Sequence, residues 1–392
     1  MEWKEVRLGD VCTKITDGSH FSPKAQTEGY PMLSVKDMRE YDFDFSNCKK
    51  ISYEDYLKME RDGCVPQIGD VLVAKDGSYL KEIFRCKEQR EIALLSSIAI
   101  FRPNSQLIDS RFLCYCLKSP RVYNYISLNC VSGSALPRII LKDFKGVNIR
   151  VPSLDDQRRI ASILSSLDRK IELNNKINAD LEEMAQAIFK NWFVDFEPFE
   201  DGKFVDSELG MIPEGWKVGT LDEIFSLKYG KNLSTSMILE KGDYPVYGAN
   251  GIIGYYNEFN CDKYSVLVTS RGNGSGDVSR THHPQSFITN NSFVVEPLEH
   301  YKYIKLPFIN GLFNIIDFKS YCSGSAQPQL TNKAMHNICI ISPPRELVIK
   351  YCEILETLFS HIECVIDENS RLSLLRDTLL PRLMSGEIEV PE

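Results

Sequence analysis

The hexapeptide Ser132-Gly-Ser-Ala-Leu-Pro137 recurs as Ser323-Gly-Ser-Ala-Gln-Pro328, at an offset of 191 residues (323 − 132). The same offset pairs Pro152 with Pro343, so the match continues without a gap beyond the hexapeptide. One short echo could arise by chance, but a collinear series of matches indicates a duplicated unit. The chain is therefore predicted to be a tandem duplication.

The two copies also correspond upstream of the hexapeptide. Gly69-Asp-Val-Leu-Val73 matches Tyr264-Ser-Val-Leu-Val268, and Trp3-Lys4 matches Trp216-Lys217. These upstream offsets are larger than 191 residues, so the first copy is the longer one. The duplication thus covers most of the chain.

Each copy begins with a part rich in glycine, aromatic residues and short β-type runs. In the first copy, Val71–Ala74, Ser97–Phe101 and Val147–Val151 predict strands that end at Gly or Pro. The stretch Arg111–Ile126 predicts a helix. We therefore expect this part to be a mixed α/β domain.

A long helix is predicted to follow each domain. No Gly or Pro occurs from Leu154 to Trp192, and Pro152, Ser153 and Asp155 mark a helix start. Steps of four and three residues select mostly apolar positions in both copies, as in a coiled coil. These seam positions are Ile160, Leu164, Leu167, Ile171, Asn174, Asn178, Leu181, Ala185, Ile188 and Trp192, with Tyr351, Leu355, Leu358, Ile362, Val365, Asn369, Leu372, Arg376, Leu379 and Leu383.

The seam favours pairing of the two helices as an antiparallel coiled coil. Asn178 and Asn369 occupy equivalent positions, so their amides would meet in such a pair and fix its register. The alternatives are that each amphipathic helix packs only on its own domain and that both amides face water. The expected fold is α+β. Its parts are a first mixed domain (1–153), a central long helix (154–196), a linker with a second mixed domain (197–343), and a C-terminal helix and tail (344–392).

Composition excludes several protein classes. The chain has 392 residues with 43% hydrophobic content, and no stretch of 18 apolar residues or apolar signal sequence occurs. Its 12 cysteines form no CxxC pair, which is typical of reduced thiols in a cytoplasmic protein. The net charge of −8 argues against a basic coat for nucleic acid but allows local basic clefts. Metal-ligand spacing, phosphate-loop and catalytic motifs are absent, so we expect neither a metal site nor catalysis.

Two homologous domains held apart by a helical spacer suit duplex DNA, whose helical turn is about 34–36 Å. Divergent domains would recognise different elements, which predicts an asymmetric, bipartite site. Basic, amide and hydroxyl side chains in glycine-containing loops can reach phosphates and base edges, although such loops are often only turns. The candidate DNA-contacting residues are Lys14, Ser19, His20, Lys24, Lys36, Lys75, Ser78, Tyr79, Arg138, Lys142, Lys228, Tyr229, Lys231, Asn232, Arg271, Asn273, Ser275, Gln327, Gln329 and Lys333.

Several longer motifs resemble one known family, the specificity (S) subunits of type I restriction–modification systems. The resemblance spans essentially the whole chain. It departs from the family pattern at Pro343–Ile349, where an acidic-acidic-Gln helix start is usual. The motifs that carry it are Trp3–Asp10, Gly133–Ile139, Val151–Gln157, Asn191–Pro198, Asp206–Trp216 and Leu379–Ile388.

The resemblance implies a non-catalytic subunit that binds double-stranded DNA and holds two methyltransferase (M) subunits and, in the full complex, restriction (R) subunits. S-adenosylmethionine would then bind the M subunits, ATP with Mg²⁺ the R subunits, and no cofactor this chain. Exposed helix residues such as Arg158 and Lys170 would contact the M subunits or simply face water. Two other classes stay open: an adaptor for protein or glycan ligands, and a stand-alone modification or restriction enzyme.

Overall fold

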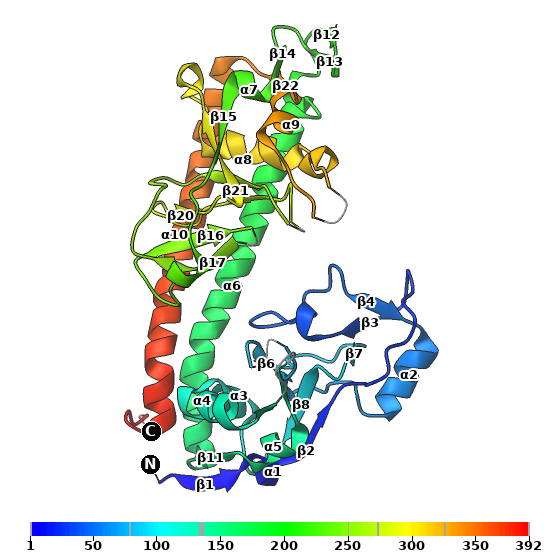
Figure 1. Ribbon diagram of the computed structural model, residues 1–392, viewed down its shortest axis with the longest axis vertical. Helices are drawn as coiled ribbons and strands as arrows, with labels where there is room; N and C mark the ends of the chain where they lie inside the picture. Colours follow the sequence, from blue (N-terminus) through cyan, green and yellow to red (C-terminus); the bar gives the residue numbers. More distant parts are fainter. Residues whose placement is uncertain are drawn as a thin grey trace. The chain divides into compact units, whose positions relative to one another are not determined.

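The computed structural model describes residues 2–77, 80–132, 137–249, 251–272, 274–324 and 327–390 (Figure 1). The chain divides into two compact units, and each long helix contributes to both. Unit 1 comprises Met1–Leu173 with Asn369–Glu392, and unit 2 comprises Asn174–Glu368. Both units combine helices and strands. The prediction of two tandem, mixed domains is therefore confirmed.

Unit 1 is built on a four-stranded sheet in the order β2-β8-β5-β6 and a three-stranded sheet in the order β4-β3-β7. Two-stranded pairs join β1 to β11 and β9 to β10. The strands are β1 (Lys4–Arg7), β2 (Cys12–Asp17), β3 (Tyr30–Leu33), β4 (Lys49–Ile51), β5 (Val71–Ala74), β6 (Ile83–Arg85), β7 (Ala93–Leu94), β8 (Ile98–Pro103), β9 (Val131–Ser132), β10 (Arg138–Ile139) and β11 (Asn148–Val151).

Unit 2 repeats this topology, with a four-stranded sheet β15-β21-β18-β19, a three-stranded sheet β17-β16-β20 and the pair β14-β22. Its hairpin β12-β13 stands apart from these sheets. The strands are β12 (Phe204–Ser207), β13 (Gly210–Pro213), β14 (Lys217–Thr220), β15 (Phe225–Tyr229), β16 (Tyr244–Gly248), β17 (Gly251–Tyr256), β18 (Val266–Thr269), β19 (Val278–Arg280), β20 (Phe287–Ile288), β21 (Ser292–Pro297) and β22 (Cys339–Ser342).

The matching register shows how closely the two copies correspond. Lys4 pairs with Val151 in unit 1, and Lys217 pairs with Ser342 in unit 2. The sequence offsets that relate the copies thus also relate their strand pairs. In unit 1, β1 follows Trp3 and pairs with β11, the last strand before the first long helix. In unit 2, β14 follows Trp216 and pairs with β22, the last strand before the second long helix.

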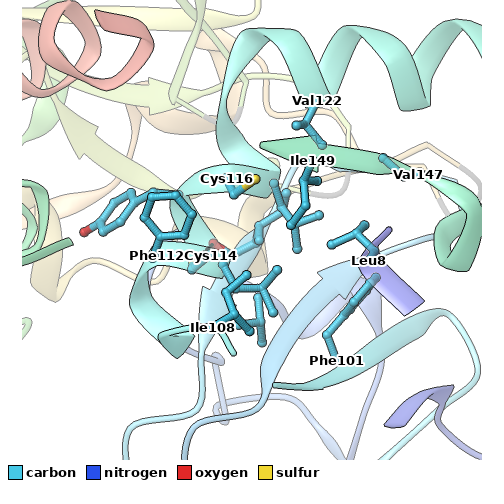
Figure 2. Packing of buried hydrophobic residues seen from close by; sticks show 14 of the residues in the cluster. Leu8, Phe101, Ile108, Phe112, Cys114, Cys116, Val122, Val147 and Ile149 are labelled. Atoms are coloured by element: carbon cyan, nitrogen blue, oxygen red, sulfur yellow. Dashed lines mark hydrogen bonds between the residues drawn. The ribbon is translucent and has the colours of Figure 1, made fainter. Parts of the chain in front are cut away.

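Burial on both faces explains the shared central strand. Every residue of β5 and of β18 is buried, as the uninterrupted Val-Leu-Val runs require. In unit 1 one side of this sheet packs on a core that includes Leu8, Phe101 and Ile149, which Figure 2 shows converging. The ring of Phe101 meets that of Phe144 edge-on, with centroids 5.1 Å apart. Burying this cluster is the main force that holds the domain together.

Ten α-helices occur in the described residues. In unit 1, Arg111–Ile126 is not the single helix that its composition predicts, because α3 ends before Ser119 and α4 begins at Pro120. Proline disfavours helical geometry in the residue before it, which forces the break. The helices are α1 (Leu8–Val11), α2 (Tyr53–Arg61), α3 (Ser110–Lys118), α4 (Pro120–Asn129), α5 (Leu141–Gly146), α6 (Leu154–Phe193), α7 (Leu221–Ile224), α8 (Leu306–Ile315), α9 (Asn332–His336) and α10 (Arg345–Ser385).

The long helix α6 begins at Leu154, as the sequence predicts, and α10 begins at Arg345, one residue after the predicted boundary. Ser153 caps α6 by accepting a hydrogen bond from the Asp156 amide at 3.2 Å. Gln157 is buried, accepts from the Asp109 amide and donates to the Pro152 carbonyl, so it joins the helix start to the domain. The equivalent residue in the second copy is Val348, which is buried in the core of unit 2. Apolar packing thus replaces the polar join where the sequence departs from the family pattern.

Candidate nucleic-acid interface

The loop after the central strand and the repeated Ser-Gly-Ser-Ala turn form a corner in unit 1. The Gly77 amide donates to the Pro137 carbonyl at 2.8 Å, and the Ile139 amide donates to the Lys75 carbonyl at 3.0 Å. Two backbone hydrogen bonds therefore fix the loop against the turn. The residues Gly133–Leu136 of the turn lie outside the described residues.

Unit 2 forms the same corner with the same two hydrogen bonds. The Gly272 amide donates to the Pro328 carbonyl at 3.2 Å, and the Leu330 amide donates to the Ser270 carbonyl at 2.9 Å. These four residues are the ones that the repeat offsets pair with the four residues of unit 1. The repeated hexapeptide therefore has a structural role, since it supports the loop of the central strand in each unit.

A third segment joins the corner in unit 1. The Ser19 amide donates to the Leu94 carbonyl at 2.7 Å, and the Ser96 amide donates back to Ser19 at 2.9 Å. A Cβ atom on Gly18 would lie only 2.2 Å from the Leu94 carbonyl oxygen, so only glycine permits this approach. The end of β2 is thereby held beside β7, which belongs to the three-stranded sheet of the unit.

The equivalent segment of unit 2 makes equivalent contacts. The Lys231 amide donates to the Ile288 carbonyl at 2.9 Å, and the Asn290 amide donates to the Lys231 carbonyl at 3.0 Å. Gly230 again has no room for a side chain, because a Cβ atom would lie 2.3 Å from the Ile288 oxygen. Three separated segments thus converge in each unit.

Lys75 joins the segments of unit 1 from inside the domain. Its side chain is 8% exposed, and its Nζ lies 3.3 Å from both Asp17 Oδ2 and Asp76 Oδ1. Its backbone amide donates to the Ser97 carbonyl. The structure therefore places this candidate residue as an internal cross-link between the end of β2 and the loop after β5.

Ser275 has a corresponding internal position in unit 2. The residue is 3% exposed, and its hydroxyl donates to the Ser270 carbonyl and accepts from the Leu330 amide, both at 3.1 Å. Both hydrogen bonds lie within the corner. No sequence pattern predicts this burial, because serine in a Gly-rich loop is usually exposed.

Other candidate residues lie at the surface of the corners. Arg138, Arg271 and Lys231 are exposed, and none has an ion pair with a carboxylate among the described parts of the chain. Phosphate oxygens are suitable partners for such cations. The candidates gathered at the two corners with exposed or partly exposed side chains are Ser19, His20, Arg138, Lys231, Asn232, Arg271, Gln327 and Gln329.

The remaining candidates lie apart from the corners or engage other side chains. Lys228 is paired with Glu296 at 2.9 Å, and the Tyr229 ring lies against Phe293. Lys36, Lys142 and Lys333 are exposed on short helices, Lys24 is exposed in a loop, and Lys14 is partly buried on β2. Ser78, Tyr79 and Asn273 lie outside the described residues.

The structure also reveals a basic and aromatic patch that the sequence reasoning missed. The segment after His20 lies along β4, where Lys49 Nζ donates to the Ser22 hydroxyl at 2.7 Å. Phe21 is 54% exposed, and Lys58 Nζ lies 5.0 Å from its ring centroid. The Lys49-Lys50 pair was a visible signal, but only the fold places it beside the Ser19 segment.

Within the described residues, no group of three or more His, Cys, Asp or Glu side chains could hold a metal ion. No described helix is both long and apolar enough to span a membrane. What the site offers is backbone-supported loops that carry cations, amides and hydroxyls.

Comparison with known proteins identifies the family. A family model described as the type I restriction modification DNA specificity domain matches residues 1–183 and 213–372. The chain belongs to this family. The first matched region starts where the first copy of the duplication starts, and the second matched region starts close to the beginning of the second copy.

Several members of this family are similar over most of their length. The type I restriction enzyme MjaIX specificity subunit of Methanocaldococcus jannaschii is 29% identical over 310 residues, which cover 73% of this chain and 70% of that protein. The type I restriction enzyme HindI specificity subunit of Haemophilus influenzae is 24% identical over an alignment of 476 residues, which covers 99% of this chain and 100% of that protein. The crystal structure of the type I restriction–modification S subunit from M. genitalium has a TM-score of 0.52 and 20% identity, covering 100% of this chain and 97% of that one. This last likeness shows the shared fold.

Proposed function

We propose that this chain is the DNA-recognition subunit of a type I restriction–modification complex and that each unit recognises one half of an asymmetric, bipartite target. The observation that best supports this proposal is that both units form the same corner with equivalent backbone hydrogen bonds. A backbone frame that the two units share, and that carries different side chains in each, is suited to recognising different sequences in the same way.

The two corners carry different side chains, which supports the proposal that the two half-sites differ in sequence. Unit 1 presents Ser19, His20 and Arg138, whereas unit 2 presents Lys231 and Arg271 together with the amides of Asn232, Gln327 and Gln329. Arginine and lysine pair with guanine, while asparagine and glutamine pair with adenine. Gly77 and Gly272 have positive φ angles of 68° and 88°, which turn the loops beside these side chains.

The long helices would space the two units by pairing as an antiparallel coiled coil. Unit 1 takes the beginning of α6 and the end of α10, and unit 2 takes the rest of each. All seam positions are buried or partly buried. At 1.5 Å per residue, the 40 residues of α6 extend about 60 Å. Such a spacer could separate the two half-sites along a duplex.

Two methyltransferase subunits would dock on the helices, and restriction subunits would join in the full complex. In this proposal the methyltransferase subunits bind S-adenosylmethionine, the restriction subunits bind ATP and Mg²⁺, and this chain is a non-catalytic, cytoplasmic scaffold. Exposed helix residues such as Arg158 are available for the docking, although Arg158 already pairs with Asp155 at 3.0 Å.

The test is co-expression with the methyltransferase subunit of the same system, followed by mapping of methylated bases in genomic DNA. We expect a bipartite motif that depends on this chain. Arg138→Ala should weaken recognition of one half and Arg271→Ala the other, by about 1–3 kcal/mol for each lost base contact. Lys302→Ala, which removes an exposed lysine paired with Glu299, is the matched control.

Methylation that persists without this chain, or an intact complex that never methylates, would refute the proposal. DNA affinity that does not fall with salt would favour an adaptor instead. Binding of S-adenosylmethionine or ATP by the purified chain alone would favour a stand-alone enzyme.

A further inference from the structure

The hairpin β12-β13 projects from unit 2 and has no role in the DNA recognition proposed above. It lies between the end of α6 and β14, and its strands pair Phe204 with Pro213 through Ser207 with Gly210. Figure 1 draws it at the edge of unit 2. Three apolar side chains of the hairpin are exposed: Val205 by 38%, Leu209 by 44% and Met211 by 55%. An isolated two-stranded hairpin with exposed apolar side chains has little intrinsic stability in water.

The base of the hairpin is nevertheless firmly attached to unit 2. Ile212 and Trp216 are 3% and 6% exposed and belong to the core of the unit. The rings of Phe196 and Phe199 each lie 5.3 Å from that of Trp216. The Glu214 amide donates to Lys203 at 2.8 Å, which closes the base. The exposed tip therefore projects from a fixed support.

The backbone that leads from α6 into the hairpin has an unusual conformation. Phe196 has a φ angle of 58°, in the left-handed region that residues with a Cβ atom rarely adopt. Its ring packs against Phe204 of the hairpin at 6.0 Å and against Trp216. Aromatic packing thus maintains a strained turn that sets the direction of the hairpin.

Most of the chain's net negative charge is concentrated around this hairpin. The segment Asp195–Trp216 contains seven carboxylates and one lysine, so it carries six of the eight net negative charges. Asp206 and Glu208 are exposed at the tip and form no ion pair with any cation in the described ranges. Unpaired carboxylates repel DNA phosphates, so the duplex is an unsuitable occupant of this surface.

We infer that the tip of the β12-β13 hairpin is a docking surface for a partner protein that presents an apolar pocket rimmed by lysine or arginine. Leu209 and Met211 would enter the pocket, while Asp206 and Glu208 would pair with its rim. The inference rests on the proposed function, which supplies the partner as a methyltransferase subunit. Charge complementarity selects this occupant over DNA, and apolar burial stabilises the contact.

The test measures binding of the full chain to the purified methyltransferase subunit of the same system, by calorimetry at low and high ionic strength. We expect Leu209→Ser/Met211→Ser to lower the affinity about ten-fold or more, as for apolar residues at the centre of an interface. Asp206→Asn/Glu208→Gln should lower the affinity at low salt and flatten its salt dependence.

Matched controls come from exposed residues elsewhere in unit 2. Ile252→Ser/Ile253→Ser removes two side chains of similar exposure on β17, and Glu258→Gln/Asp262→Asn removes two exposed carboxylates. Both controls should retain the wild-type affinity. Circular dichroism establishes that every variant is folded before binding is compared.

The outcomes separate this inference from the proposed function. Wild-type affinity in both hairpin variants, with sequence-specific methylation intact, would overturn the docking surface and leave DNA recognition standing. A chain that forms dimers in sedimentation only while its hairpin is intact would assign the tip to a second copy and also overturn the inference. A wild-type complex that assembles but does not methylate DNA would instead refute the proposed function.

Discussion

Ser275→Ala distinguishes a residue that holds the corner of unit 2 together from one that contacts DNA directly. The hydroxyl is buried and makes two hydrogen bonds of 3.1 Å, to the Ser270 carbonyl and from the Leu330 amide. Alanine keeps the shape of the side chain but removes both bonds. The Leu330 amide retains its 2.9 Å bond to the Ser270 carbonyl, so both of these groups stay partly satisfied.

The expected cost follows from these contacts. The two lost hydrogen bonds, whose backbone partners stay partly satisfied, together cost about 1–3 kcal/mol of the free energy of unfolding. For a unit of this size, a change of 1 kcal/mol shifts Tm by about 2–4 °C. Ser275→Ala should therefore lower the Tm of unit 2 by roughly 2–12 °C, and DNA affinity should fall only through loosening of the corner.

Tryptophan fluorescence can isolate the response of unit 2. Trp192 and Trp216 belong to unit 2 and Trp3 to unit 1, so the measurement uses a Trp3→Phe background. Ser279→Ala, at an exposed serine on the neighbouring strand β19, is the matched control and should not change Tm. An unchanged Tm in Ser275→Ala together with a clear loss of DNA affinity would refute the structural role and assign the hydroxyl to DNA.

Three further predictions concern the packing and charge of each unit. Gly311→Ala should destabilise unit 2 by about 1–3 kcal/mol in urea unfolding despite the better helix propensity of alanine, because its Cβ would lie 2.1 Å from Phe189 Cδ2. Burial lowers the pKa of His282 below 6.5, so below that pH the unfolded chain binds a proton that the folded chain resists. The stability of unit 2 should therefore fall as pH decreases through 6.5, and His282→Gln should flatten the pH dependence of the urea midpoint. Arg376→Met should destabilise unit 1 by about 3 kcal/mol in the same assay, because it leaves the buried Asp168 carboxylate without its 3.0 Å ion pair.

Each of these predictions has a control within the same chain. Gly146→Ala introduces a Cβ atom with nothing within 4 Å, so it should not destabilise unit 1. His300→Gln changes an exposed histidine and should leave the pH dependence as it is. Adding Asp168→Asn to Arg376→Met removes the unpaired charge and should restore much of the stability. Failure of that rescue would mean that the apolar stem of Arg376, rather than its charge, stabilises the unit.

The sequence was most informative where structure depends on local spacing. The heptad steps identified helix positions that are all buried or partly buried, because the period of the α-helix alone decides which residues share a face. The repeat offsets likewise predicted equivalent strands. Backbone hydrogen bonds such as Gly77 to Pro137 and Gly272 to Pro328 recur only if both copies keep the same spacing.

The direction of individual side chains could not be predicted in this way. Lys75 looked like an exposed loop cation, but Asp17 approaches it from another strand and pairs with it inside the domain. Arg376 interrupts the apolar seam because Glu40 and Asp168, which are distant in sequence, surround its guanidinium. Such partners meet only through tertiary structure, so local patterns contain no signal for them.

The net charge of the chain is a misleading guide to its surface for a related physical reason. Most of the net charge of −8 comes from the segment Asp195–Trp216, and the rest of the chain is close to neutral. Electrostatic attraction to DNA acts over about 8 Å at physiological salt, so it depends on the charges near each corner and not on the total. In the proposed function, Arg138 and Arg271, which have no carboxylate partner among the described residues, would therefore contact phosphate or base edges, and acidic side chains elsewhere would select a protein partner. Neutralising Asp206 and Glu208 should accordingly leave the salt dependence of DNA binding nearly unchanged, whereas removing either arginine should reduce it by about one counterion.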